Sequence, residues 1–312
     1  MSEFFTVAIL TATLTSGIRQ AVPYLLAALG EAVSQRAGVL NLGVEGVMLI
    51  GAFSAYYATL ETKSAAIGLL MGLLAGMFMG LIYAFITVVM HAEQGISGIG
   101  IYLFGLGFTD LLFQKQVGTP RPIQGLKTKP MNWLAEDTGR VGELLFSHTI
   151  LTYVAFLLVP AVYWLVTRTT FGLNVRAVGE NPHAADTLGV SVNGVRAAAI
   201  VFGNTMAGLA GAVLVLDIVQ NFQQNLTAGR GFIAIALVYF GAWRPLRVMA
   251  GALLFGIVSS TVLTLQALDV ISGSVTSIAN MAPAVLTVIV LVVVSRRIGQ
   301  PAALTKPFTR DA

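Results

Sequence analysis

The chain contains no cysteine and few charged residues, and both shortages narrow the class of protein. Without cysteine it forms no disulfide and no thiolate metal site, so redox chemistry does not identify its compartment. Charged side chains make up only 10% of the 312 residues, whereas hydrophobic residues make up 56%. A soluble domain typically carries about 25% charged residues. The composition therefore predicts a membrane protein.

The usual signatures of catalysis are also missing. The sequence has no G-x-x-x-x-G-K-[ST] loop, no H-E-x-x-H and no G-x-S-x-G, and His91, His148 and His183 are far apart. We therefore expect no catalytic residue, metal site or cofactor, and the chain is not expected to be an enzyme. If it works with ATP, another subunit must bind the nucleotide. The net charge of +4 suits a membrane surface and gives no reason to expect nucleic acid binding.

Apolar stretches of membrane-spanning length recur along the chain, without the period-two alternation of a transmembrane barrel. They predict an all-α fold, a polytopic transmembrane helical bundle of eight or nine spans that forms a single domain over residues 1–312. The shortest block, 231–243, covers only about 20 Å at ~1.5 Å per residue, less than the ~30 Å hydrocarbon core. A half-helix or another discontinuous segment is expected there. The blocks are 4–29, 41–60, 65–90, 97–113, 148–167, 196–217, 231–243, 248–266 and 280–295.

Basic residues predict the orientation of the bundle. Because Lys and Arg favour the cytoplasmic side, the basic C-terminal tail is expected in the cytoplasm. If block 231–243 counts as a crossing, the central loop 171–196 is cytoplasmic too, and segment 114–147 lies outside. That outer segment carries five basic and three acidic residues, which argues against this orientation, and the conflict stays open. The basic residues of the tail are Arg296, Arg297, Lys306 and Arg310.

The central loop contains a short helix between polar turns. Asn181 and Pro182 are typical of a helix start, and Gly189 is typical of a helix end. The helix of about two turns between them is too short to be stable alone, so it needs a partner surface or the membrane-embedded body. From the residues alone it is either a docking loop or an ordinary solvated loop. Its expected apolar face consists of Ala184, Ala185 and Leu188, with His183 and Asp186 in water.

Residues 30–46 place polar side chains and four glycines between two apolar helices. Ionisable groups at membrane depth are costly, so they are expected to pair, to face a cavity or to lie at an interface. Two interpretations stay open: an irregular ligand site like those of many transporters, or a tight turn with a structural Glu–Arg pair. The polar residues are Glu31, Arg36, Asn41 and Glu45. Asp110, Asp217 and Asp269, near other predicted helix ends, are expected to be solvated caps.

Small residues recur every four positions in two apolar blocks, which predicts that these helices approach closely in lipid. Segment 95–108 is equally rich in glycine but irregular, and it either bends to line a cavity or packs tightly. The two ridges consist of Gly68, Gly72, Gly76 and Gly80 in one block and Ala199, Gly203, Ala207 and Gly211 in the other.

Three segments carry a family resemblance: GEAVSQRAGVLNLGVEGVMLIGA at 30–52, RAVGENPHAADTLGVSVNGVRAAAIVFGNTMAGLAGAVL at 176–214, and GRGFIAIALVYFGAWRPLRVMAGALLFG at 229–256. Together they resemble the permease subunits of ABC importers of the branched-chain amino acid and simple-sugar class, and within it the nucleoside-type permeases. The resemblance implies that residues 179–190 form a cytoplasmic coupling helix seated in a cleft of an ABC ATPase subunit. The coupling residues would be Gly179, Glu180, Asn181, His183, Ala184, Ala185, Asp186 and Gly189.

The resemblance also implies partners and a substrate class. We expect a second related permease chain or a second copy of this one, an extracytoplasmic substrate-binding protein or lipoprotein, and a place in the bacterial plasma membrane. The ligand would be a nucleoside or a related small polar solute. The chain departs from the family at Gln35, where Glu is frequent, and at Tyr102, where Asn is usual, so the ligand is not fixed. The expected substrate path consists of Glu31, Arg36, Asn41, Glu45 and Tyr102.

Two rival hypotheses remain at the level of sequence. An ion-coupled secondary transporter would use Glu31, Arg36 and Glu45 as a charge site and would need no ATPase. A non-transporting assembly subunit is the third interpretation.

Overall fold

The structure is a computed structural model that describes residues 7–126, 129–137, 139–294 and 299–309. These residues form helices, turns and loops, with no strand among them. The long helices are α1 (Val7–Arg36), α2 (Val44–Thr62), α3 (Ala65–Ala84) with the π-helical turn η1 (Phe85–Val89), α4 (Gln94–Gln116), α7 (Ile150–Arg168), α10 (Val192–Val213) with the π-helical turn η2 (Leu214–Val219), and α12 (Pro245–Ala267). The shorter helices are α5 (Asn132–Asp137), α6 (Gly139–Phe146), α8 (Thr170–Glu180), α9 (Pro182–Thr187), α11 (Arg230–Phe240), α13 (Ser274–Asn280) and α14 (Ala282–Val294).

The helices agree with a membrane bundle. Within the described residues, five segments are long and apolar enough to cross a membrane. The predicted block 231–243 corresponds to α11, whose 11 residues at ~1.5 Å each span only about half of the ~30 Å hydrocarbon core. The all-helical fold is therefore confirmed, and the total of eight or nine spans stays a prediction. The five segments are Ala65–Val89, Gln94–Gln116, Ile150–Arg168, Val192–Val219 and Pro245–Ala267.

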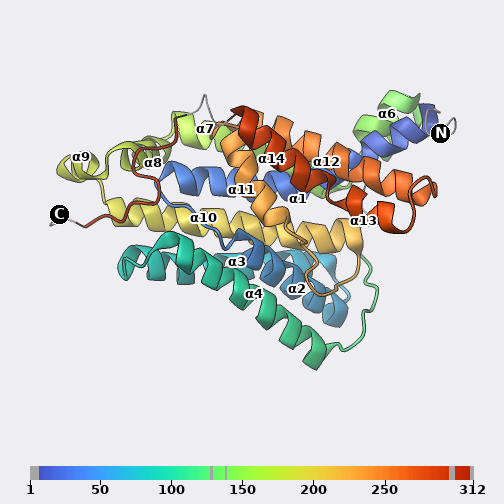
Figure 1. Cartoon of the computed structure of the whole chain (residues 1–312), viewed down its shortest axis with the longest axis horizontal. Helices are drawn as coiled ribbons and strands as arrows, with labels where there is room; N and C mark the ends of the chain where they lie inside the picture. Colours follow the sequence, from blue (N-terminus) through green and yellow to red (C-terminus); the bar gives the residue numbers. More distant parts are fainter. Residues whose placement is uncertain (1–6, 127–128, 138, 295–298, 310–312) are drawn as a thin grey trace.

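The helix α10 is the centre of the bundle (Figure 1). It packs against α1 on one side and against α2 and α3 on the other, while α12 packs along α1 and α4 packs on α2. The apolar window of segment Val192–Val219 is 78% buried, whereas the other four candidate spans are 28% to 39% buried. A membrane helix this enclosed contacts protein on nearly every side, so α10 serves as the common packing partner of the bundle.

Glycines set how closely these helices approach. A Cβ atom added to Gly76 of α3 would lie 2.5 Å from the carbonyl oxygen of Asn204 on α10. One added to Gly51 of α2 would lie 2.4 Å from the carbonyl oxygen of Gly208. Real Cβ atoms do not come this near, so the backbones touch only because these side chains are absent. The predicted close packing along the small-residue ridges is confirmed.

The two ends of the long axis carry different segments (Figure 1). One end, which we call the α9 end, holds α8, α9 and the chain's C-terminal residues, and the other, the α6 end, holds α6, α13 and the start of α1. The central loop and segment 114–147 therefore lie at opposite ends of the molecule.

Candidate functional site

The bend between α1 and α2 is held by Glu31 and Asn41. One oxygen of the Glu31 carboxylate accepts hydrogen bonds from the Gln35 side chain at 2.9 Å and from the backbone N–H of Asn41 at 3.0 Å. The Asn41 amide donates to the side-chain oxygen of Asn204 on α10 at 2.9 Å and accepts from the backbone N–H of Gly43 at 2.8 Å. Glu31 thus attaches the irregular segment 37–43 to α1, and Asn41 attaches it to the central helix α10.

Glu45 caps the start of the half-helix α11. One carboxylate oxygen accepts from the Thr227 hydroxyl at 2.6 Å and from the N–H of Gly229 at 2.6 Å, and the other accepts from the N–H of Gly231 at 2.5 Å. Free N–H groups and the helix dipole make a helix N-terminus attractive to an anion. Glu45 is only 1% exposed, so its charge is compensated by backbone N–H groups deep in the protein.

Arg36 does not pair with either glutamate. Among the described residues, the one ion pair within 4.0 Å is between Arg19 and Asp217. The expected structural Glu–Arg pair in segment 30–46 is therefore wrong, because Glu31 and Glu45 are satisfied by amide and hydroxyl donors. Arg36 instead lines a cavity of about 350 Å³ at the α9 end, apart from the other predicted path residues.

Tyr102 lies beside the capped start of α11. Its ring on α4 packs edge-on against Phe232, with ring centroids 5.2 Å apart. A Cβ atom added to Gly46, next to Glu45, would lie 2.7 Å from the Tyr102 Cα atom. The structure therefore brings Tyr102 and Glu45 to one region and Glu31 and Asn41 to another.

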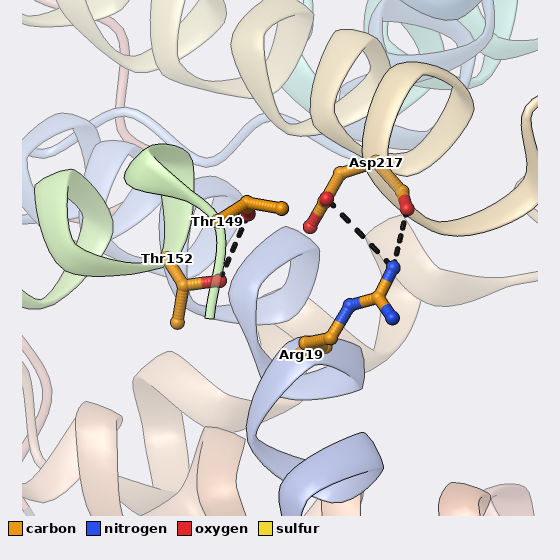
Figure 2. A network of polar contacts seen from close by, with 4 residues as sticks. All are labelled: Arg19, Thr149, Thr152 and Asp217. Carbon is orange, nitrogen blue, oxygen red and sulfur yellow. Dashed lines mark hydrogen bonds and ion pairs between the residues drawn. The ribbon is translucent and has the colours of Figure 1, made fainter. Parts of the chain in front are cut away.

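Sequence reasoning missed a polar contact at the far end of α10 (Figure 2). Asp217, expected to be a solvated cap, lies in η2 and is only 1% exposed, so that expectation is wrong. The Arg19 guanidinium of α1 donates to its backbone oxygen at 2.6 Å and lies 3.7 Å from its carboxylate. Thr149, just before α7, lies beside this pair, so three segments distant in sequence meet here. The sequence feature that could have revealed this contact is Arg19 itself, because it is the first basic residue in the sequence and lies within an apolar block.

His148, between α6 and α7, lies in the same region. It is 2% exposed, and its Nε2 atom lies 2.9 Å from the backbone oxygen of Leu144. Burial is the main reason that the pKa of His148 is lowered. Burial thus disfavours the charged imidazolium, and the ring packs edge-on against Tyr153, with ring centroids 6.2 Å apart.

The short helix of the central loop forms as predicted. The Asn181 side chain accepts from the N–H of Ala184 at 3.0 Å, and Pro182 opens α9. Gly189 follows with φ of +84°, a left-handed conformation that glycine adopts without steric cost. These local signals fix both ends of α9.

The faces of α9 differ from the expected apolar face. Only Ala185 packs inward, where it is 3% exposed in a cluster with Val178, Val192 and Phe308. Ala184 is exposed, and Leu188 is 84% exposed. The reason is that Gly189 turns the chain back toward α10 and leaves the preceding leucine at the tip. A cavity of about 500 Å³ beside α9 is lined in part by His91, Asp186 and Asn193.

The described residues contain no cluster of three or more His, Asp or Glu side chains able to hold a metal ion. The site therefore consists of the half-helix α11, whose start is capped by Glu45, and the exposed short helix α9. Such an arrangement can hold a rigid bundle and present a docking surface.

Comparisons with known proteins point in one direction. The family model for the permease component of branched-chain amino acid transport systems matches residues 13–294. The chain is 36% identical to the putative glucose ABC transporter permease protein TsgC13 of Haloferax volcanii, over 96% of this chain and 97% of the relative. It is 32% identical to the guanosine ABC transporter permease protein NupQ of Bacillus subtilis, over 97% and 98%. It is 33% identical to the nucleoside ABC transporter permease protein NupC of Lactococcus lactis, over 86% and 87%. The guanosine permease protein NupP, also of Bacillus subtilis, is 27% identical over 77% of this chain. No solved structure matches.

Proposed function

The chain belongs to the family of permease components of branched-chain amino acid transport systems and is the permease subunit of an ABC importer, and we propose that it passes a nucleoside or a simple sugar inward. The relatives are named for guanosine, nucleosides and glucose, which supports this substrate class. The subunit is not itself an enzyme, so ATP hydrolysis takes place on a partner chain.

The substrate path is proposed to run past Tyr102. Its ring and that of Phe232 lie beside the start of α11, and Phe232 is 41% exposed, so this pair is reachable from outside the chain. Aromatic faces suit nucleobases and sugar rings. Glu31, Asn41 and Glu45 would support the path from behind, because their oxygens are already bonded within the protein. The same bonds leave Glu31 and Glu45 poorly placed to bind a coupling ion. The comparisons also do not favour an ion-coupled carrier.

The permease is proposed to work as half of a pair. Two permeases of Bacillus subtilis, NupQ and NupP, both match this chain, at 32% and 27% identity. Because one organism has two different guanosine permease proteins, we favour pairing of this chain with a second, related permease over pairing with a second copy. The ABC family also implies an ATPase and a substrate-binding protein as partners, and we place the latter at the α6 end.

The α9 end is proposed to be cytoplasmic. Arg36 and Arg176 line a cavity there, and Arg196 donates to the backbone oxygen of Lys306 in the C-terminal tail at 3.0 Å. Basic residues concentrated at one end favour the cytoplasmic side. The tail would then be cytoplasmic, while segment 114–147 and the start of α1 would face outward.

This orientation predicts which single cysteines react with a membrane-impermeant maleimide. The natural chain has no cysteine, so each variant carries one reactive site and the parent is the control. We expect Val141→Cys on α6, a position 66% exposed, to be labelled in intact cells. Leu188→Cys, at a position 84% exposed, should be labelled only after permeabilisation of cells that express the permease without its ATPase. Labelling of Leu188→Cys in intact cells would reverse the orientation.

The coupling helix α9 carries the proposed mechanism. Its base is fixed by Ala185, and Ala184 and Leu188 at its tip are exposed among the residues that the structure describes. A short rigid helix of this kind can transmit movement of an ATPase as a lever. Because Ala185 packs within its own chain, we assign it to anchoring α9 and assign contact with the ATPase to the exposed residues.

Leu188→Asp should reduce recovery of the ATPase about tenfold or more when the tagged permease complex is purified, and ATP-dependent uptake of labelled nucleoside or glucose should fall with it. A charge at the centre of a docking contact costs about 2 kcal/mol or more. Val141→Asp, a matched change at the α6 end, should keep wild-type ATPase recovery. Normal recovery and uptake with Leu188→Asp would refute the docking assignment.

A further inference from the structure

A cavity at the α9 end gathers basic side chains from distant parts of the chain. It has a volume of about 350 Å³, and its walls come from the end of α1, from α8, from the turn between α11 and α12, and from the tail after α14. Arg36 and Arg176 line it, and the charge of Arg244 acts on Arg36 together with that of Arg176. The full lining is Arg36, Arg176, Glu180, Ala242, Trp243, Gly299 and Pro301.

Among the residues that the structure describes, no carboxylate forms an ion pair with the arginines around this cavity. In the part of the chain that the structure describes, the one guanidinium–carboxylate contact within 4.0 Å is Arg19–Asp217, between α1 and η2. Glu180 is the one acid in the lining, and it attracts Arg36 without reaching ion-pair distance. Among the described residues, the partner of Arg176 is the backbone oxygen of Gly172, to which it donates at 3.3 Å. Within the described ranges, two arginines and one glutamate therefore line this cavity, and the charge of Arg244 acts on Arg36 from outside the lining.

The walls of the cavity are fixed by hydrogen bonds. The Trp243 indole donates to the Gln35 side chain of α1 at 2.9 Å. The tail is held on both sides, because the N–H of Ala303 donates to the backbone oxygen of Gly179 at 2.9 Å and that of Thr305 donates to Gly38 at 3.2 Å. Arginines on a fixed frame are a common way to bind phosphate, since a guanidinium presents paired donors to two oxygens.

We propose that this cavity binds a phosphate-bearing anion, supplied either by the headgroup of an anionic phospholipid or by a soluble phosphate compound. The basic side chains would neutralise the phosphate, and the apolar surface of Ala242, Trp243 and Pro301 would pack against the adjoining carbon chain. Basic pockets between membrane helices suit lipid headgroups in this way. The bound group would bridge α1 to α8, the helix that leads into α9.

Binding is tested with the purified full chain by thermal unfolding and by native mass spectrometry. The probes are phosphatidylglycerol, phosphatidylcholine as a neutral-headgroup reference, and soluble glycerol phosphate. Wild-type protein should retain phosphatidylglycerol or glycerol phosphate and unfold at a higher temperature with it than with phosphatidylcholine. The probe that acts identifies the source of the phosphate. Equal behaviour with all three probes would overturn the proposal.

Three variants distinguish binding in this cavity from a general effect of positive surface charge. The double variant Arg36→Gln/Arg176→Gln should bind the active probe about tenfold more weakly or worse. Arg247→Gln, an exposed charge removed near the same turn and outside the lining, should bind like wild type. Glu180→Gln removes the one acid and should bind a few-fold more tightly, a gain that misfolding does not produce. Unchanged affinity in both the double variant and Glu180→Gln would overturn the site.

Discussion

Glu45→Ala should destabilise the protein by about 3 to 6 kcal/mol, because three donors lose their acceptor at once. The carboxylate accepts from the Thr227 hydroxyl and from the N–H groups of Gly229 and Gly231. Each buried donor left unpaired costs about 1–3 kcal/mol. Chemical unfolding of the purified protein in detergent measures the loss directly.

The control for this prediction is on the same helix. Glu61→Ala removes an exposed carboxylate near the other end of α2, and it should change stability by less than about 0.5 kcal/mol. Glu45→Gln should fall between the two, since a side-chain amide keeps one acceptor oxygen and points N–H groups at donors. If Glu45→Ala and Glu61→Ala were equally stable, the carboxylate would not be holding α11.

Gly208→Ala should cost about 3 kcal/mol or more, although it adds a single methyl group. The new Cβ atom would lie 2.5 Å from the backbone oxygen of Gly72 and 2.6 Å from the Gly76 Cα atom, so α3 and α10 must separate. Overpacking of a well-packed core typically costs about 1–3 kcal/mol, and here the obstacles are backbone atoms that cannot rotate away. The same unfolding measurement applies.

Gly107→Ala is the matched control for the glycine contact. Gly107 lies on α4, and a Cβ atom there would meet nothing within 4 Å. Alanine is favoured over glycine in a helix by about 1 kcal/mol, so this variant should be neutral or slightly stabilised. A similar loss in both variants would mean that helix flexibility, and not backbone contact, explains the role of Gly208.

The features that the sequence predicts well are local ones. Asn181, Pro182 and Gly189 act within a few residues of one another, so the short helix and its ends follow from capping chemistry. The ridge containing Gly72 and Gly76 predicts close packing because a repeat of four residues stays on one helix face. Which helix that face would touch does not follow from the repeat.

The partners of buried charges depend on tertiary structure. Glu45 meets Gly229 and Gly231 more than 180 positions later, and Arg19 meets Asp217 at a separation of 198. No spacing rule connects such positions. The sequence therefore shows that these buried charges are costly, but it does not show which residues are their partners. The exposed face of α9 was misjudged for a related reason, because the direction of Leu188 depends on how the chain returns to α10.

The starting position of α1 has a consequence for how the protein enters the membrane. Helix α1 begins at the α6 end, opposite α9, so in the proposed orientation this N-terminal end of the helix must be carried across the bilayer during synthesis. Positive charge resists such translocation, and the first lysine or arginine in the sequence is Arg19. The start of α1 therefore carries no Lys or Arg that would oppose this crossing, and Arg36 at the opposite end of the helix favours the cytoplasmic side.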